Sequence, residues 1–114
     1  MDGCIFCKIV AGGQSNERVY QDDQVSAFWD VHPAAPTHLL IVPNRHIASV
    51  NELSPEDESL VGHMVLVARQ LAYERGFAED GYRLIVNTGP HGGQHIYHLH
   101  LHLLGGKRLH NPVE

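Results

Sequence analysis

The chain has 114 residues, of which 43% are hydrophobic, and a formal net charge of -5 at pH 7, so we expect one globular domain, residues 1–114, without a surface that binds DNA or RNA. The sequence does not open with a basic segment followed by an apolar run, and its longest aliphatic stretch, residues 39–42, is too short to span a bilayer. These features predict a cytoplasmic protein that binds neither nucleic acid nor membrane.

A Cys-x-x-Cys motif lies at the start of the first predicted helix. Residues 5–11 alternate like one or two helical turns, and Gly12-Gly13 marks the helix end. The motif contains both cysteines of the chain, Cys4 and Cys7. In a reducing compartment such a pair is a metal clamp or two buried thiols rather than a disulfide. A thioredoxin-like redox motif would follow a strand, and only a few residues precede this one.

A β-hairpin is predicted next. Residues 18–20 and 25–29 are rich in β-branched and aromatic side chains, and they flank the polar residues 21–24, which favour a turn.

A loop and a core strand follow this hairpin. Residues 31–36 contain two prolines and predict a loop, whereas residues 38–42 predict a buried strand that ends at Pro43. This loop should bring Asp30 and His38 close together near one edge of the sheet.

The longest predicted helix opens at Ser54, which can cap it, and Pro55 suits the first helical position. Arg75 and Gly76 are expected to end the helix. Its apolar stripe has the spacing of one buried helical face and consists of Leu60, Met64, Val67, Ala68, Leu71 and Ala72.

The last two predicted strands are joined by a glycine-containing loop. Residues 82–87 form the first of them, and residues 88–94 contain three glycines that let backbone N–H groups approach an anion such as phosphate. The alternative is a simple turn. The complete pattern predicts an α+β fold, in which one long and one short helix cover one face of a five-stranded antiparallel sheet.

The final strand carries His98, His100 and His102 at every second position, with leucines between them. In an extended strand the three imidazoles line one surface while the leucines pack inward. Because histidine titrates near neutrality, such a row indicates metal ligation, proton transfer or nucleophilic attack. The alternative is the polar outer face of an edge strand.

Residues 98–104 match the signature His-φ-His-φ-His-φ-φ, where φ is apolar, and in this respect the chain resembles the histidine triad (HIT) family of nucleotide-binding proteins. The likeness extends over nearly the whole chain and is strongest to the nucleoside phosphoramidases of that family. Further motifs that carry it are residues 4–10, 34–43, 44–47 and 92–94.

The resemblance implies that His100 is a nucleophile. It would attack the α-phosphorus of a purine nucleoside 5′-phosphoramidate, form a nucleotidyl-histidine intermediate and release the nucleoside monophosphate after hydrolysis. His102 would bind phosphate oxygens and assist the leaving group, and His38 would lie beside the phosphate. A backbone carbonyl would hold the Nδ1 proton of His100. No metal is required for catalysis in this scheme.

The same resemblance assigns substrate-binding residues. Asp30 would accept hydrogen bonds from the ribose, and Asn87 would lie near ribose and phosphate, whereas from the residues alone Asp30 is a turn former and His38 a structural imidazole. The phosphate side would be formed by Gly93, Gln94 and His95, the last standing where phosphoramidases commonly have serine. The walls around the base would be Ile5, Phe6, Ile9, Phe28 and Val31.

A metal site is implied separately. Cys4, Cys7, His46 and His98 resemble the zinc ligands of several bacterial members of the family, which would give His98 a structural role. The alternative is two reduced thiols without metal. The resemblance also implies a homodimer.

Other functions remain open at this stage. A dinucleoside polyphosphate hydrolase would share the nucleophile and differ in the leaving group. A non-catalytic nucleotide-binding regulatory protein would bind nucleotide without turnover. A metalloenzyme would gather the three histidines of the row on one catalytic metal.

Overall fold

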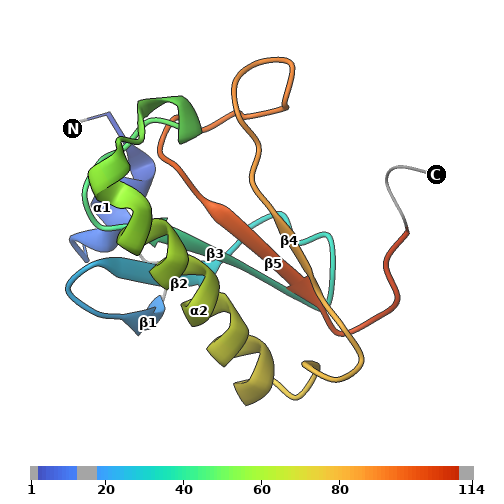
Figure 1. Ribbon diagram of the computed structural model, residues 1–114. Coiled ribbons are helices and arrows are strands. Elements are labelled where there is room, and N and C mark those ends of the chain that lie inside the picture. Colours follow the sequence, from blue (N-terminus) through green and yellow to red (C-terminus); the bar gives the residue numbers. More distant parts are fainter. Residues whose placement is uncertain (1–2, 13–17, 111–114) are drawn as a thin grey trace.

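The computed structural model describes residues 3–12 and 18–110. One antiparallel sheet with the strand order β1-β2-β3-β5-β4 forms its centre (Figure 1). The elements are α1 (Ile5–Val10), β1 (Arg18–Gln21), β2 (Val25–Trp29), β3 (Thr37–Pro43), two 3-10 turns (Val50–Glu52 and Pro55–Asp57), α2 (Glu58–Glu74), β4 (Arg83–Ile85) and β5 (Leu101–Gly105). The predicted five-stranded α+β fold is therefore confirmed.

The two helices lie on opposite faces of the sheet, so the expectation that they share one face is wrong (Figure 1). On β3, Leu39 and Ile41 belong to the core under α2, whereas Leu40 and Val42 belong to the core under α1. Successive side chains of a strand point to opposite faces, and a strand covered on both faces needs apolar residues throughout. The unbroken run in β3 is the sequence signal of this two-sided burial.

The start of α2 follows the predicted capping pattern with one difference. The backbone N–H of Ser54 donates to the carboxylate of Asp57 across 2.9 Å, and the first turn, Pro55–Asp57, is a 3-10 turn rather than α-helix. Gly76 adopts a φ of +84° just after the helix, a conformation that glycine adopts without steric cost. The predicted stripe packs against the sheet, with Leu60 partly buried and the remaining five residues fully buried.

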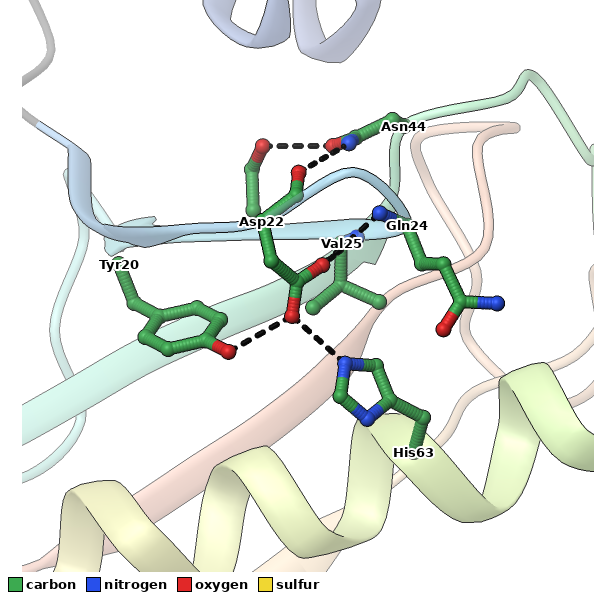
Figure 2. Close-up of polar contacts among 7 residues, drawn as sticks. Tyr20, Asp22, Gln24, Val25, Asn44 and His63 are labelled. Atoms are coloured by element: carbon green, nitrogen blue, oxygen red, sulfur yellow. Dashed lines mark hydrogen bonds and ion pairs between the residues drawn. The ribbon is translucent and has the colours of Figure 1, made fainter.

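A polar network ties the β1–β2 turn to α2 (Figure 2). The carboxylate of Asp22 accepts hydrogen bonds at 2.6 Å from both Tyr20 Oη and His63 Nε2. Its other oxygen accepts the backbone N–H groups of Gln24 and Val25, each at 2.8 Å. Burial raises the pKa of Asp22, but these hydrogen bonds outweigh burial and hold its pKa far below the usual range. A single ionised carboxylate therefore fixes the predicted hairpin against the long helix.

Strand β5 begins at Leu101, so His98 and His100 precede the strand instead of lying within it. This preceding segment is anchored by the backbone N–H of Leu99, which donates to the carbonyl of Ile47 across 2.7 Å. The expected alternation persists there, because the leucines at 99, 101 and 103 all enter the core under α2. The helix α1 ends at Val10, and Gly13, part of the predicted stop, lies outside the described residues.

Strand β4 is shorter than predicted, and it pairs with β5 as the expected antiparallel neighbour. Among the described residues, no helix combines the length and apolarity that crossing a membrane requires.

Candidate active site

The predicted histidine row is not an exposed surface. Its histidines lie on the α1 side of the sheet, where His98 is fully buried and His100 is 8% exposed. The ring of Phe6, from α1, meets His98 and His100 edge-on at centroid distances of 5.9 and 5.2 Å. Helix α1 thus covers the row and gives the three imidazoles different surroundings.

The ring of His100 is fixed in one orientation and one tautomer. Its Nδ1 lies 2.8 Å from the carbonyl oxygen of His98. Because a carbonyl only accepts, Nδ1 must carry the proton, and Nε2 of the neutral ring keeps its lone pair. His100 lines a cavity of about 540 Å³, which gives this lone pair a space in which to meet a substrate.

Hydrogen bonds also set the tautomers of His38 and His102. The backbone N–H of Ala34 donates to Nδ1 of His38 across 3.0 Å, so Nε2 of His38 carries the proton of the neutral ring. This Nε2 lies 2.9 Å from Nδ1 of His102, which accepts, and the remaining proton of His102 is therefore on its Nε2. Asp30 lies near His38, with Oδ2 3.4 Å from Nε2, as the sequence predicted.

Both histidines of this pair are neutral at pH 7. Burial lowers the pKa of His38, although the carboxylate of Asp30 opposes the shift. Burial and the neighbouring His100 and His38 lower the pKa of His102 to about 4. His102 therefore offers an uncharged N–H donor at the cavity.

Most of the predicted substrate residues line the cavity beside these histidines. It has Asp30, Asn87, Gly93 and His95 on its polar side. Its predicted apolar lining consists of Ile5, Phe6, Ile9, Phe28 and Val31. The structure adds residues that the sequence reasoning missed, namely Trp29, His32, Leu40 and Ile96. Leu40 could have been found, because it pairs with Phe28 across β2 and β3 and shares its face.

Two predicted site residues do not line the cavity. His38 contacts two residues that line the cavity, His102 through the hydrogen bond between the rings and Asp30 across 3.4 Å. The amide of Gln94 is used inside the protein: its Nε2 donates to the carbonyls of Ala48 and Ile96 at 2.8 and 3.0 Å, and its Oε1 accepts the N–H of Gly89 at 3.0 Å. Gln94, predicted to bind substrate, thus holds the glycine-containing loop in place.

The glycine-containing loop is also fixed from its outer side. Asn87 Nδ2 donates to the carbonyl of Gly92 across 2.7 Å. A Cβ at Gly92 would lie 2.3 Å from the carbonyl oxygen of Thr88, so only glycine fits there. This tight loop places Gly93 at the cavity wall.

A separate cluster brings together the four predicted metal ligands. Nδ1 of His98 lies 3.3 Å from Cys4 Sγ and 3.5 Å from Cys7 Sγ, and Nδ1 of His46 lies 3.3 Å from Cys7 Sγ. Ligands of tetrahedral zinc, with bonds of about 2.0–2.3 Å, are roughly 3.3–3.8 Å apart. Nε2 of His98 donates to the carbonyl of Pro43 across 2.8 Å, which leaves the Nδ1 lone pair facing the thiols. The donor set therefore fits a tetrahedral metal ion.

The chemistry of these ligands agrees with their geometry. Burial lowers the pKa of His98 and keeps its ring neutral, the form that coordinates metals. Burial and the adjacent Cys4 thiol raise the pKa of Cys7, so a cation is needed to hold its thiolate at neutral pH. Within residues 3–12 and 18–110, His98, His100 and His102 do not form a common ligand cluster, because His98 joins the cysteines.

The chain is similar to known proteins over nearly its whole length. Residues 3–111 match the family model described as "Scavenger mRNA decapping enzyme C-term binding". The purine nucleoside phosphoramidase of Escherichia coli K12 is 54% identical over 105 residues, which cover 92% of this chain and 88% of that protein. Protein HitA of Neisseria gonorrhoeae is 43% identical, with coverages of 92% and 97%.

Solved structures of similar proteins indicate the same family. A HIT family hydrolase from Legionella pneumophila Philadelphia 1 superposes with a TM-score of 0.94 at 44% identity, covering 96% of this chain and 98% of that one. A histidine triad protein from Clostridium difficile gives a TM-score of 0.93 at 45% identity, with coverages of 97% and 96%. The resemblance inferred from the histidine signature is thereby confirmed, and the chain belongs to the histidine triad family.

Proposed function

We propose that the chain is a hydrolase that cleaves purine nucleoside 5′-phosphoramidates to the nucleoside monophosphate and a free amine. The observation that carries this proposal is the hydrogen bond from His100 Nδ1 to the carbonyl of His98, which leaves a nucleophilic nitrogen at a cavity. The name of the Escherichia coli relative supports the choice of substrate.

The reaction would proceed in two displacements. Nε2 of His100 attacks the α-phosphorus, and the P–N bond breaks as the leaving nitrogen takes a proton from solvent and departs as the amine. Water then attacks the nucleotidyl-histidine, releases the monophosphate and returns a proton to solvent. The Nε2–H of His102 would hydrogen-bond phosphate oxygens and the leaving nitrogen, and His38 would hold His102 in the tautomer that donates.

The nucleoside would occupy the apolar half of the cavity. Asp30 uses Oδ1 to accept the N–H of His32 at 2.8 Å, and each oxygen retains a lone pair for a ribose hydroxyl. Asn87 and Gly93 line the same cavity and would approach ribose and phosphate. Two aromatic rings, Phe6 and Phe28, pack edge-on with centroids 5.3 Å apart and provide an apolar aromatic wall for a purine.

We further propose a structural zinc ion held by Cys4, Cys7, His46 and His98. When bound, zinc would tie α1 to the histidine segment and would take no part in the reaction. Because the site needs reduced thiols, the cytoplasm is the proposed compartment. His98 would then have two roles. Its ring would bind the zinc ion, and its backbone carbonyl would accept the hydrogen bond from His100.

The proposed assembly is a homodimer in which a second copy covers the outer side of α2 and the free edge of β4. Strand β4 ends the sheet order, which leaves one edge available for pairing. Large apolar side chains are exposed along α2, namely Val61, Val65, Leu66 and Tyr73. Light scattering of the wild-type chain and of Leu66→Glu tests this assembly, and a monomeric wild type would contradict it.

Turnover of adenosine 5′-phosphoramidate tests the main proposal. We expect the wild type to release AMP and His100→Asn to lose about 10³-fold or more in activity. Mass spectrometry of a rapidly quenched reaction should detect an acid-labile nucleotidyl group on His100. Tight AMP binding without release would instead favour a regulatory nucleotide-binding protein. Faster cleavage of a dinucleoside polyphosphate than of the phosphoramidate would favour the other hydrolase activity.

A further inference from the structure

A cavity of about 660 Å³ lies at the end of the sheet where β4 begins and β5 ends. Its walls come from the segment after α2, the start of β4 and the segment that follows β5. None of the residues that line the nucleotide cavity lines this one. It is therefore a separate space, to which the proposed hydrolase reaction assigns no role.

Positive charge is concentrated around this cavity. The chain carries only eight lysines and arginines against thirteen acidic residues. Four of the eight, Arg75, Arg83, Lys107 and Arg108, line this one cavity, with Asp80 as the single carboxylate in its wall. Among the described residues, none of these four forms an ion pair within 4.0 Å. An acidic protein thus places half of its lysines and arginines around one cavity, where the described residues form no ion pair with them.

A contact with an aromatic ring fixes the position of one of these cations, Arg75. The guanidinium of Arg75 lies over the ring of Trp29, 4.7 Å from its centroid. Such a contact fixes the planar group and leaves its N–H donors directed to the edge of the ring. Arginine binds phosphate and carboxylate oxygens through two parallel hydrogen bonds, so a preset guanidinium favours an oxyanion over a simple halide.

We propose that this cavity binds a small molecule carrying an oligophosphate chain, either free or as part of a nucleotide. Several adjacent negative charges are needed to match four cations, and a chain of two or three phosphates supplies them. The volume lies within the range of about 300–1,000 Å³ that is typical of small-molecule sites. The net charge of -5 opposes a long polyanion at a distance, which argues against a nucleic acid.

Calorimetric titration of the full chain with inorganic triphosphate tests the site. We expect binding to weaken at least tenfold in Lys107→Ala/Arg108→Ala. The matched control is Lys8→Ala/Arg69→Ala, which removes the same charge from two equally exposed residues elsewhere and should bind within about twofold of the wild type. Titration with ATP in parallel identifies the carrier of the phosphate chain, and either ligand supports the proposal if the first variant alone loses it.

Trp29 offers a second readout, because it is the only tryptophan in the chain and contacts Arg75. Triphosphate should shift its emission in the wild type and in His100→Asn but not in Lys107→Ala/Arg108→Ala. Equal weakening in both double variants, loss of binding in His100→Asn, or no binding at millimolar triphosphate would overturn the proposal. Phosphoramidase turnover of the same variants separates this result from the proposed function, since Lys107→Ala/Arg108→Ala should retain it.

Discussion

The backbone carbonyl of His98 accepts a hydrogen bond from Nδ1–H of His100 at 2.8 Å, while the ring of His98 contacts the two cysteine thiols. The residue that orients the proposed nucleophile is thus also a member of the proposed metal site. The ring and the carbonyl of His98 are joined through its own Cα, so we expect the two sites to be coupled through this residue.

The first prediction concerns this connection. Cys4→Ser/Cys7→Ser should remove a metal content of about one zinc ion per chain, measured by elemental analysis of the purified protein. Turnover should fall, because metal would no longer tie α1, which carries Ile5, Phe6 and Ile9 of the cavity wall, to the segment that orients His100. Wild-type protein that contains no zinc after growth in zinc-supplemented medium would contradict the metal assignment.

The second prediction concerns pH and stability. Because the pKa of His102 falls from 6.5 to about 4 on folding, the unfolded chain binds a proton between these values and the folded chain does not. The contribution of this residue to stability is therefore complete above pH 6.5 and is lost as the pH falls toward 4. Urea unfolding at pH 7.5 and pH 5.0 should show a smaller loss in His102→Gln than in the wild type. His110→Gln, at an exposed position, should keep the wild-type difference.

The third prediction concerns the turn network of Figure 2. Asp22→Asn should lower the free energy of unfolding by about 2–3 kcal/mol at pH 7, because it removes a charged acceptor shared by Tyr20 and His63. Tyr20→Phe removes one of these bonds and should cost about 1 kcal/mol. The low pKa of Asp22 means that the difference between wild type and Asp22→Asn should shrink as the pH falls below 4. Unchanged stability in Asp22→Asn would refute this role.

The fourth prediction concerns Gln94. Since both the nitrogen and the oxygen of its side-chain amide bond to backbone, Gln94→Ala should destabilise the chain by about 1–3 kcal/mol and raise KM by loosening the loop at Gly93. Gln70→Ala, which removes an exposed amide bonded only to Glu74, is the matched control and should change neither value. A direct role in substrate binding would instead raise KM without loss of stability.

The sequence predicted the helices, the strands and the residues of the site better than it predicted which parts of the fold pack around those residues. The turn residues around Asp22 and the capping group at Ser54 act locally, and both were found from the sequence. The position of α1 was missed, because it depends on packing between residues distant in the chain. His98 was recognised as a metal ligand only by resemblance, and its burial by Phe6 could not be read from spacing.

The site is assembled from the two ends of the chain, since Cys4 and His98, 94 positions apart, lie in contact. Contacts of such long sequence separation form late, because the intervening chain must first be ordered. During synthesis the contacts of α1 with His98 and His100 can therefore form only after residues 98–100 have left the ribosome. A nascent chain that has not yet exposed residues 98–102 therefore lacks both the His98 ring at the cysteines and the His100 ring at the cavity.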